Sequence, residues 1–172
     1  MLGGFSMTAA AVAVVIDRQR VTQYRCPSRQ SLTNWVVRTL AALPESPAGG
    51  EVTIRYVEPA ESQSLNQQFR HQDQPTNVLS FPAEEDPSLP GPHTGAGLPY
   101  LGDLVICPAV VEAEAAEQGK SRRAHHAHMV VHGILHLLGY DHLSSDEAEV
   151  MESVETQVLA ALGHPDPYTY NS

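Results

Sequence analysis

The sequence predicts an α/β fold, in which strands and helices alternate along a single domain. Three observations lead to this prediction. The length of 172 residues is that of one ordinary domain, and 42% hydrophobic with 17% charged residues is enough to bury a core. Short apolar segments also alternate with helical patterns. We expect one domain over residues 8–172, with residues 1–7 as an extension that carries no pattern.

The first half of the chain predicts two strands and two helices. Ala11–Asp17 is short, apolar and rich in valine, which predicts a buried strand. Ser28 is a candidate N-cap for a helix that runs to about Leu43 and carries one apolar face. Alternation over Glu51–Glu58 predicts a half-buried strand. Pro59 suits the first turn of a short helix that follows it.

Two more strands are predicted at Val78–Phe81 and Tyr100–Cys107. Between them, residues 82–99 contain five prolines and three glycines, which predicts a loop. A loop of this length is either a tolerated insertion or a mobile lid, and we favour the insertion.

Three helices are predicted in the last third of the chain. One begins at Pro108 and ends at Gly119. The segment Arg122–Leu138 is apolar nearly all round, which predicts a buried helix. A capping-box pattern at Ser144 begins a last helix that runs to about Leu162.

The net charge of −10 argues against a generic nucleic-acid coat and against a polybasic membrane anchor. The longest apolar run near the start has eight residues, whereas a membrane span needs about 20. Two cysteines do not make a disulfide framework, so a reduced cytoplasmic protein is the simplest interpretation. Residues 1–70 carry seven basic and five acidic side chains, and residues 71–172 carry three and fifteen. An anionic substrate is therefore expected to meet the first half.

The chemistry is concentrated in a histidine motif near the end of the buried helix. His132 and His136 are four residues apart, so both rings project from one helix face and can hold one metal ion. Gly139 can end the helix in a left-handed conformation. The chain can then fold back and bring His142 to the same ion. Three neutral imidazoles with one open position are typical of a catalytic zinc site.

Four other polar side chains lie near the motif. His125 and His128 extend the face of the two helical histidines, and we expect them to support the ligands or to fill the core. His126 is expected at the surface. Asp141 lies next to the third histidine in sequence, and we expect it to orient a histidine by hydrogen bonding.

The histidine spacing matches that of the metzincin proteases, whose motif is His-Glu-x-x-His-x-x-Gly-x-x-His. This chain has Gly133 where those enzymes carry the glutamate that acts as general base. The difference argues against peptide hydrolysis, although a zinc hydrolase with another base and another substrate stays open as an alternative.

The motif His-Gly-x-Leu-His-Leu-x-Gly-Tyr-Asp-His, together with several further segments, resembles the YbeY family of bacterial endoribonucleases. The similarity extends from about residue 8 to residue 170. The further segments are Ser64–Arg70, Pro75–Pro82, Leu101–Ile106, Asp146–Met151, Leu162–Gly163 and Asp166–Tyr168. Asn77 departs from the family, in which many members carry aspartate. The loop from Asp86 to Pro99 is longer or more irregular than the family needs.

The resemblance implies a mixed sheet of about four strands, with the histidine-bearing helix packed centrally and flanked by other helices. It implies a single-strand-specific, metal-dependent endoribonuclease that matures the 3′ end of the small-subunit ribosomal RNA and takes part in ribosome quality control. One zinc ion per chain would be held by His132, His136 and His142, and Arg70 would be catalytic. A ribosomal protein or another ribosome-associated factor is an expected partner. No association with a membrane is expected.

The sequence leaves the reaction chemistry open. The general base is unassigned, and either water or the 2′-hydroxyl of the RNA is a candidate nucleophile. A non-catalytic ribosome assembly factor with a structural metal is the remaining alternative.

Overall fold

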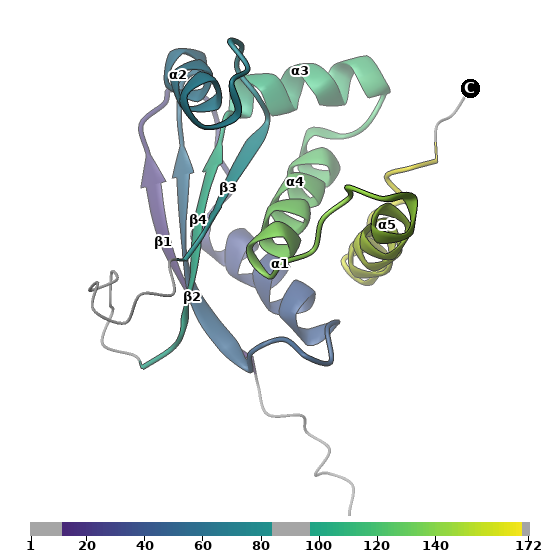
Figure 1. Cartoon of the computed structure of the whole chain (residues 1–172). Coiled ribbons are helices and arrows are strands. Elements are labelled where there is room, and N and C mark those ends of the chain that lie inside the picture. Colours follow the sequence, from purple (N-terminus) through teal and green to yellow (C-terminus); the bar gives the residue numbers. More distant parts are fainter. Residues whose placement is uncertain (1–11, 84–96, 170–172) are drawn as a thin grey trace, which may run out of the picture.

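The computed structural model describes residues 12–83 and 97–169, which form four strands and five helices (Figure 1). The predicted extension at residues 1–7 and most of the predicted loop at 82–99 lie outside the described residues. The elements, in chain order, are β1 (Ala13–Arg20), α1 (Arg29–Ala41), β2 (Gly49–Tyr56), α2 (Pro59–Arg70), β3 (Val78–Pro82), β4 (Tyr100–Ile106), α3 (Pro108–Gln118), α4 (Arg122–Leu137) and α5 (Ser145–Ala161).

The strands form one mixed sheet in the order β1-β2-β4-β3. β1 and β4 both pair in parallel with β2, whereas β3 runs antiparallel to β4. The predicted α/β class and the sheet of about four strands are therefore confirmed.

The burial of the first two strands differs from the prediction. β1 is an edge strand in which only Ile16 is buried, so the predicted buried strand is wrong. β2 lies between two strands and is buried at every position except Arg55, so its predicted half-buried character is also wrong. The sequence of β2 alternates because threonine and charged residues stand between its apolar residues. The strand nevertheless lies inside the sheet, between β1 and β4. Burial depends on strand order, which the pattern of a single strand does not contain.

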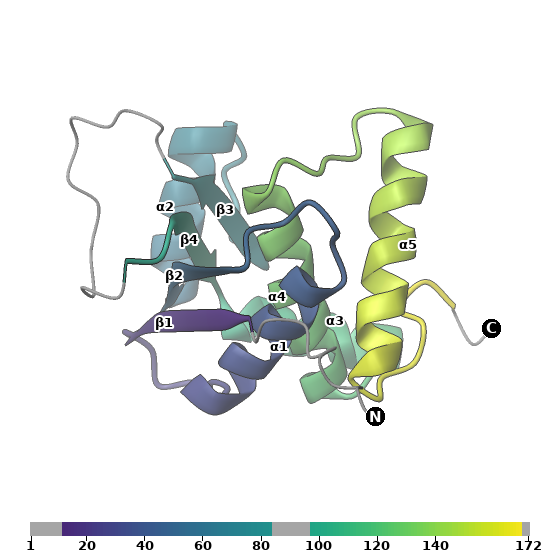
Figure 2. The same ribbon diagram turned by 90° about the horizontal axis from the view of Figure 1, so that it is seen from below.

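Helices cover both faces of the sheet, and the larger core lies on the α4 side. Alternate residues of β4 enter different cores: Leu104 and Ile106 join the main core with α1 and α4, and Val105 joins a small core that includes Leu65 of α2. Two views show α4 between the sheet and α5 (Figures 1 and 2). The predicted central position of the histidine-bearing helix is confirmed.

The sequence fixes both ends of α4 locally. The Ser121 hydroxyl accepts a hydrogen bond from the Ala124 amide and caps the N-terminus. After the helix, Gly139 adopts a φ of 98°, in the region that only glycine enters cheaply. The chain therefore turns at the predicted residue and continues toward α5, whose predicted cap, Ser144, accepts from the Glu147 amide.

Gly133 allows α4 to approach the sheet closely. A Cβ atom built at this position would lie 2.8 Å from Cδ2 of Leu104 and 3.4 Å from Cγ2 of Val78. Both neighbours are buried in the core. A side chain as large as glutamate has no room here, so the missing metzincin base follows from how this helix packs on its sheet.

Candidate metal centre

The three histidines of the motif lie together at the C-terminal end of α4. The ring centroids of His132 and His136 are 4.5 Å apart, and the ring of His142 lies 5.9 Å and 5.4 Å from them. The i, i+4 spacing brings the first two rings together, and the turn at Gly139 brings the third. The spatial cluster is thus the one that the spacing predicts.

A buried carboxylate on α5 holds one of these rings. Glu155 is fully buried, and its Oε2 lies 2.9 Å from Nδ1 of His132 and 2.7 Å from Nε2 of His128. The hydroxyl of Tyr168 donates to Oε1 of the same carboxylate over 2.7 Å. With Nδ1 donating to Glu155, the proton of His132 stays on that nitrogen and Nε2 keeps its lone pair.

The free ring nitrogens of the first two histidines face one another. Nε2 of His132 lies 3.1 Å from Nε2 of His136. Two nitrogens bound to one tetrahedral zinc ion at 2.0–2.1 Å would be separated by about 3.3–3.4 Å. The observed separation is close to that value, so the donor set fits a metal of this kind.

A second donor group overlaps the first. It has three atoms within 4.8 Å of one another: one ring nitrogen of His128, one ring nitrogen of His132 and one carboxylate oxygen of Glu155. One nitrogen of each ring is hydrogen-bonded to that carboxylate. We favour the three-histidine set, because a carboxylate that accepts from the distal nitrogen of a ligating histidine is the usual support of a zinc site.

The charge states around the cluster favour metal binding. Burial, with smaller contributions from the neighbouring imidazoles, lowers the pKa of His136 below the usual histidine value. Burial alone would raise the pKa of Glu155, but hydrogen bonds from His128 and His132 outweigh it and lower that pKa to about 2. A neutral imidazole beside an ionised carboxylate is the form that binds a divalent ion.

His128 supports Glu155 as a neutral ring. Burial lowers its pKa, although the hydrogen bond to Glu155 acts in the opposite direction. Its Nδ1 is buried without a hydrogen-bond partner among the described residues. A proton on that nitrogen would be buried and unsatisfied, so the ring carries its proton on Nε2 and donates to the carboxylate.

The predicted surface position of His126 is wrong. The residue is 4% exposed, and its Nε2 lies 3.0 Å from the hydroxyl of Tyr56. It packs at 6.2 Å from the ring of Trp35. Because α4 lies between the sheet and the helices α1, α3 and α5, the side of α4 that carries His126 is more buried than the metal cluster. A helix that is apolar nearly all round leaves no polar face for this histidine.

A second buried histidine pair involves α3. His125 Nε2 lies 2.9 Å from Oε1 of Glu114, and the amide of Asn77 donates to both oxygens of that carboxylate. The role of His125 as a supporting or core group is consistent with this position. An aspartate at position 77 could not donate these hydrogen bonds, so the amide suits its partner.

Arg70 is exposed, and Asp141 is partly buried. Arg70 ends α2, and its guanidinium makes no ion pair with any described residue. Oδ1 of Asp141 accepts from the backbone amide of His142 over 2.8 Å. It lies 3.7 Å from Nδ1 of that ring, too far for a hydrogen bond. The described contacts do not join Arg70 to the histidine cluster.

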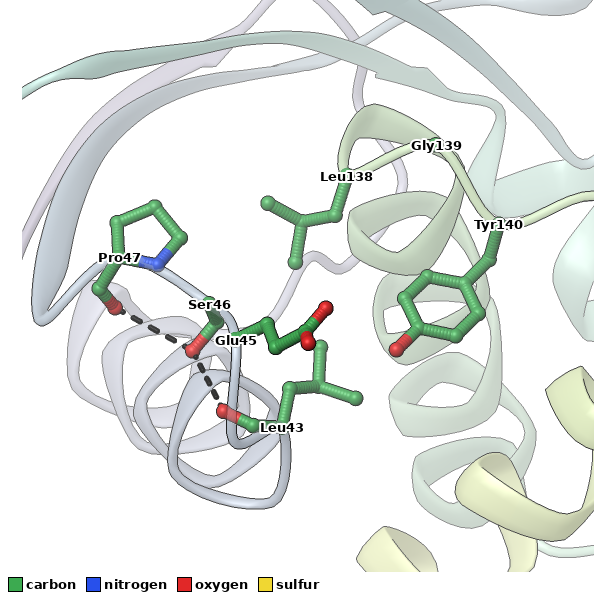
Figure 3. Close-up of a pocket in the computed structure, with 7 residues that line it drawn as sticks. All are labelled: Leu43, Glu45, Ser46, Pro47, Leu138, Gly139 and Tyr140. Atoms are coloured by element: carbon green, nitrogen blue, oxygen red, sulfur yellow. Dashed lines mark hydrogen bonds between the residues drawn. The ribbon is translucent and has the colours of Figure 1, made fainter.

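A pocket of about 360 Å³ lies beside the turn that follows α4. Leu138 and Tyr140 point into it from the turn, and Leu43 and Glu45 face them from the segment after α1 (Figure 3). None of the predicted site residues lines this pocket. The turn beside the pocket is held by the Tyr140 amide, which donates to the carbonyl of Leu135.

Sequence reasoning missed Glu155 and Glu114 as partners of the buried histidines. A signal for Glu155 is present in the sequence. It is the one acidic residue on the α5 face formed by Met151, Val158 and Leu159, which are all buried. A charged residue on an apolar helix face is buried only if it is paired.

Comparisons with known proteins agree on one family. A family profile described as Endoribonuclease YbeY matches residues 15–163. Proteins named Endoribonuclease YbeY from Pseudomonas putida and Pseudomonas fluorescens are 54% and 53% identical to this chain over 153 residues. These alignments cover 89% of the chain and 92% and 95% of the two relatives.

A solved solution structure from Thermotoga maritima is also similar, with a TM-score of 0.55 and 28% identity over 91% of this chain and 99% of that one. No helix among the described residues is long and apolar enough to cross a membrane. The histidine cluster, the mixed sheet and the sequence matches lead to one conclusion: the chain belongs to the endoribonuclease YbeY family.

Proposed function

We propose that this protein is a zinc-dependent endoribonuclease that cleaves single-stranded RNA in the cytoplasm, at the 3′ end of the small-subunit ribosomal RNA and in ribosome quality control. Membership of the YbeY family supports the endoribonuclease activity and the role in ribosomal RNA processing. The metal, the ligands and the cleavage site belong to the proposal.

One observation carries the metal assignment. His132 uses Nδ1 to bond a fully buried carboxylate and presents Nε2 to His136 at 3.1 Å, with the ring of His142 beside both. We assign these three rings as the ligands of one zinc ion. A three-histidine set leaves one coordination position open, which suits catalysis better than a closed structural site. The ion would supply Lewis-acid polarisation of a phosphate oxygen.

The chain's own groups then have distinct tasks. Glu155 keeps the proton of His132 on Nδ1 and holds the orientation of the ring. Arg70 is assigned to the scissile phosphate, because its planar guanidinium can donate two parallel hydrogen bonds to phosphate oxygens. Its exposure and the absence of an ion pair with the described residues leave it available for RNA. Negative charge that develops on the phosphate is stabilised by such a donor.

The packing of Gly133 argues against the peptidase alternative. A metzincin-type glutamate cannot be placed at this position without displacing Leu104. The alternative of a non-catalytic assembly factor predicts a closed metal site, whereas the side chain of His142 is 56% exposed. A ribosomal protein or another ribosome-associated factor is a suitable partner, because a chain with a net charge of −10 gains little from long-range attraction to RNA.

The direct test is cleavage of RNA by metal-replete protein. Single-stranded and fully paired RNA of the same sequence are incubated with the protein, with and without a chelator, beside the His136→Ala variant. We expect cleavage of the single strand that stops with chelator and is restored by added zinc. Cleavage by chelated protein at the parental rate would contradict the metal assignment.

A further inference from the structure

A cavity of about 520 Å³ lies at the N-terminal ends of α1 and α4. It is separate from the histidine cluster, since Arg123 precedes His132 by nine residues, or about 14 Å along the helix axis. The residues that matter to the argument are Arg25, Ser31, Trp35, Arg122, Arg123 and His126.

The lining of this cavity is strongly basic in a strongly acidic protein. The whole chain has 10 lysines and arginines against 20 acidic residues, yet three arginines and no acidic residue line the cavity. Two further arginines, from β1, hold the segment that leads to its wall. Arg18 donates to the carbonyl of Pro27 over 2.8 Å, and Arg20 donates to the carbonyl of Tyr24 over 3.1 Å.

The backbone adds to the positive potential. α1 and α4 both begin here, and neither helix has an acidic residue in its first turn. The N-terminus of a helix carries a partial positive charge, so acidic residues are the usual choice at this position. α4 instead begins with Arg122 and Arg123. Arginine is an unfavourable residue beside the positive end of a helix dipole. An anion that binds between the two helix ends would explain why arginines are found there.

The three arginines differ in how they are held. Arg123 lies over the ring of Trp35 at 5.3 Å and donates to the hydroxyl of Ser31 over 3.2 Å, so its guanidinium is fixed. Arg122 pairs with Glu112 over 3.0 Å, but its side chain is 52% exposed. Arg25 is exposed and has no ion pair with any described residue. The guanidinium of Arg123 is thus preorganised, and those of Arg122 and Arg25 are accessible to an anionic ligand.

We propose that this cavity is a second phosphate-binding site, which holds the backbone of single-stranded RNA away from the cleavage centre. The inference rests on the proposed function, since it takes the substrate to be RNA. Guanidinium groups match phosphate oxygens in geometry as well as in charge. A protein that repels RNA overall requires local cationic sites to retain it, and this cavity is where the arginines gather.

The test compares binding of a non-cleavable, 2′-O-methylated single strand by fluorescence anisotropy at several salt concentrations. The variant is Arg25→Gln with Arg122→Gln, which leaves the fixed Arg123 in place. The matched control is Arg38→Gln, an exposed arginine at the other end of α1. Glu112→Gln is a second control, because it removes the ion-pair partner of Arg122 and keeps the arginine.

We expect the double variant to bind the strand about tenfold more weakly at low salt. The slope of log affinity against log salt should also fall in magnitude by about 1.4, the value for two phosphate contacts on a single strand. Arg38→Gln should change neither quantity by a comparable amount, and Glu112→Gln should bind at least as tightly as the parental protein. Cleavage of a long RNA should show a raised KM and an unchanged kcat.

Three outcomes would overturn the inference. In the first, the double variant binds RNA as tightly as the Arg38→Gln control while the parental protein still cleaves RNA, so the proposed function stands without this site. In the second, inorganic phosphate or adenosine monophosphate displaces the strand at micromolar concentration, which assigns the cavity to a free phosphate compound. In the third, an acidic peptide of equal charge displaces the strand equally well. A parental protein that neither binds nor cleaves RNA would overturn the proposed function itself.

Discussion

Oε2 of Glu155 lies 2.9 Å from Nδ1 of His132, and this contact connects α5 to the metal cluster on α4. The same oxygen accepts from His128. The carboxylate is fully buried and ionised, so the two imidazoles that donate to it compensate for the cost of its burial. Helix α5 therefore fixes the orientation of the His132 ring, which belongs to α4.

Replacing this carboxylate tests its role as a support for the metal. We expect Glu155→Gln to weaken zinc binding by about 10–100-fold, the usual effect of removing a hydrogen-bond partner of a ligand. The measurement is competition with a chelator of known affinity. Glu152→Gln, an exposed change on the same helix, is the control and should bind zinc like the parental protein. Equal affinity in both variants would show that Glu155 does not act on the metal.

The close approach at Gly133 predicts a loss of stability on substitution. In Gly133→Ala the new methyl group meets Leu104 at 2.8 Å, and overpacking costs about 1–3 kcal/mol. The higher helix propensity of alanine recovers about 1 kcal/mol. We expect a net loss of about 1 kcal/mol in urea unfolding.

A second variant separates crowding from other effects. In a Leu104→Ala background, the added methyl group has room, so Gly133→Ala should be neutral or stabilising there. An equal cost in both backgrounds would mean that contact with Leu104 is not the cause.

The buried position of His126 predicts that the stability of the fold depends on pH. Burial, with a smaller effect of His125, lowers its pKa to about 4 in the folded state, whereas an unperturbed histidine titrates near 6.5. Between these values the unfolded chain binds a proton that the folded chain does not. The contribution to stability is therefore complete above pH 6.5 and is lost as the pH falls to 4, by up to about 3 kcal/mol.

The measurement is urea unfolding of chelator-treated protein at several pH values between 7.5 and 4. His126→Gln should flatten this part of the profile relative to the parental protein, because it removes the titrating group. Two parallel profiles would assign the pH dependence to other residues.

Arg70→Ala is expected to reduce kcat for RNA cleavage by about 10²–10³-fold, the cost of one lost donor to a developing negative charge. Folding and metal content should not change, since the side chain is exposed and makes no ion pair with the described residues. Arg70→Lys should restore activity only in part, because a point charge lacks the planar fork. Single-turnover cleavage with Arg38→Ala as the control measures this, and a parental rate in Arg70→Ala would remove Arg70 from the reaction.

The local features of this fold could be predicted from the sequence. The caps at Ser28 and Ser144, the helix end at Gly119 and the turn at Gly139 each depend on a few neighbouring residues, and the structure contains all of them. The clustering of His132, His136 and His142 follows from the same local rules. The assignment of these residues to a zinc ion stays a prediction.

Features that depend on tertiary packing could not be predicted in this way. The edge position of β1 and the burial of β2 depend on strand order. The burial of His126 depends on α1, which covers that face of α4 through Trp35. The contact of Glu155 with His132 joins residues 23 positions apart, and no pattern within α4 indicates its partner.

The most direct test of the metal centre is X-ray absorption spectroscopy of the zinc-loaded protein, together with the zinc content of the His142→Ala variant. We expect one zinc ion per chain, three imidazole nitrogens at about 2.0–2.1 Å, and loss of most of the metal in His142→Ala. A spectrum with two imidazoles and a carboxylate, together with full zinc content in His142→Ala, would contradict the account and place the ion between His128, His132 and Glu155.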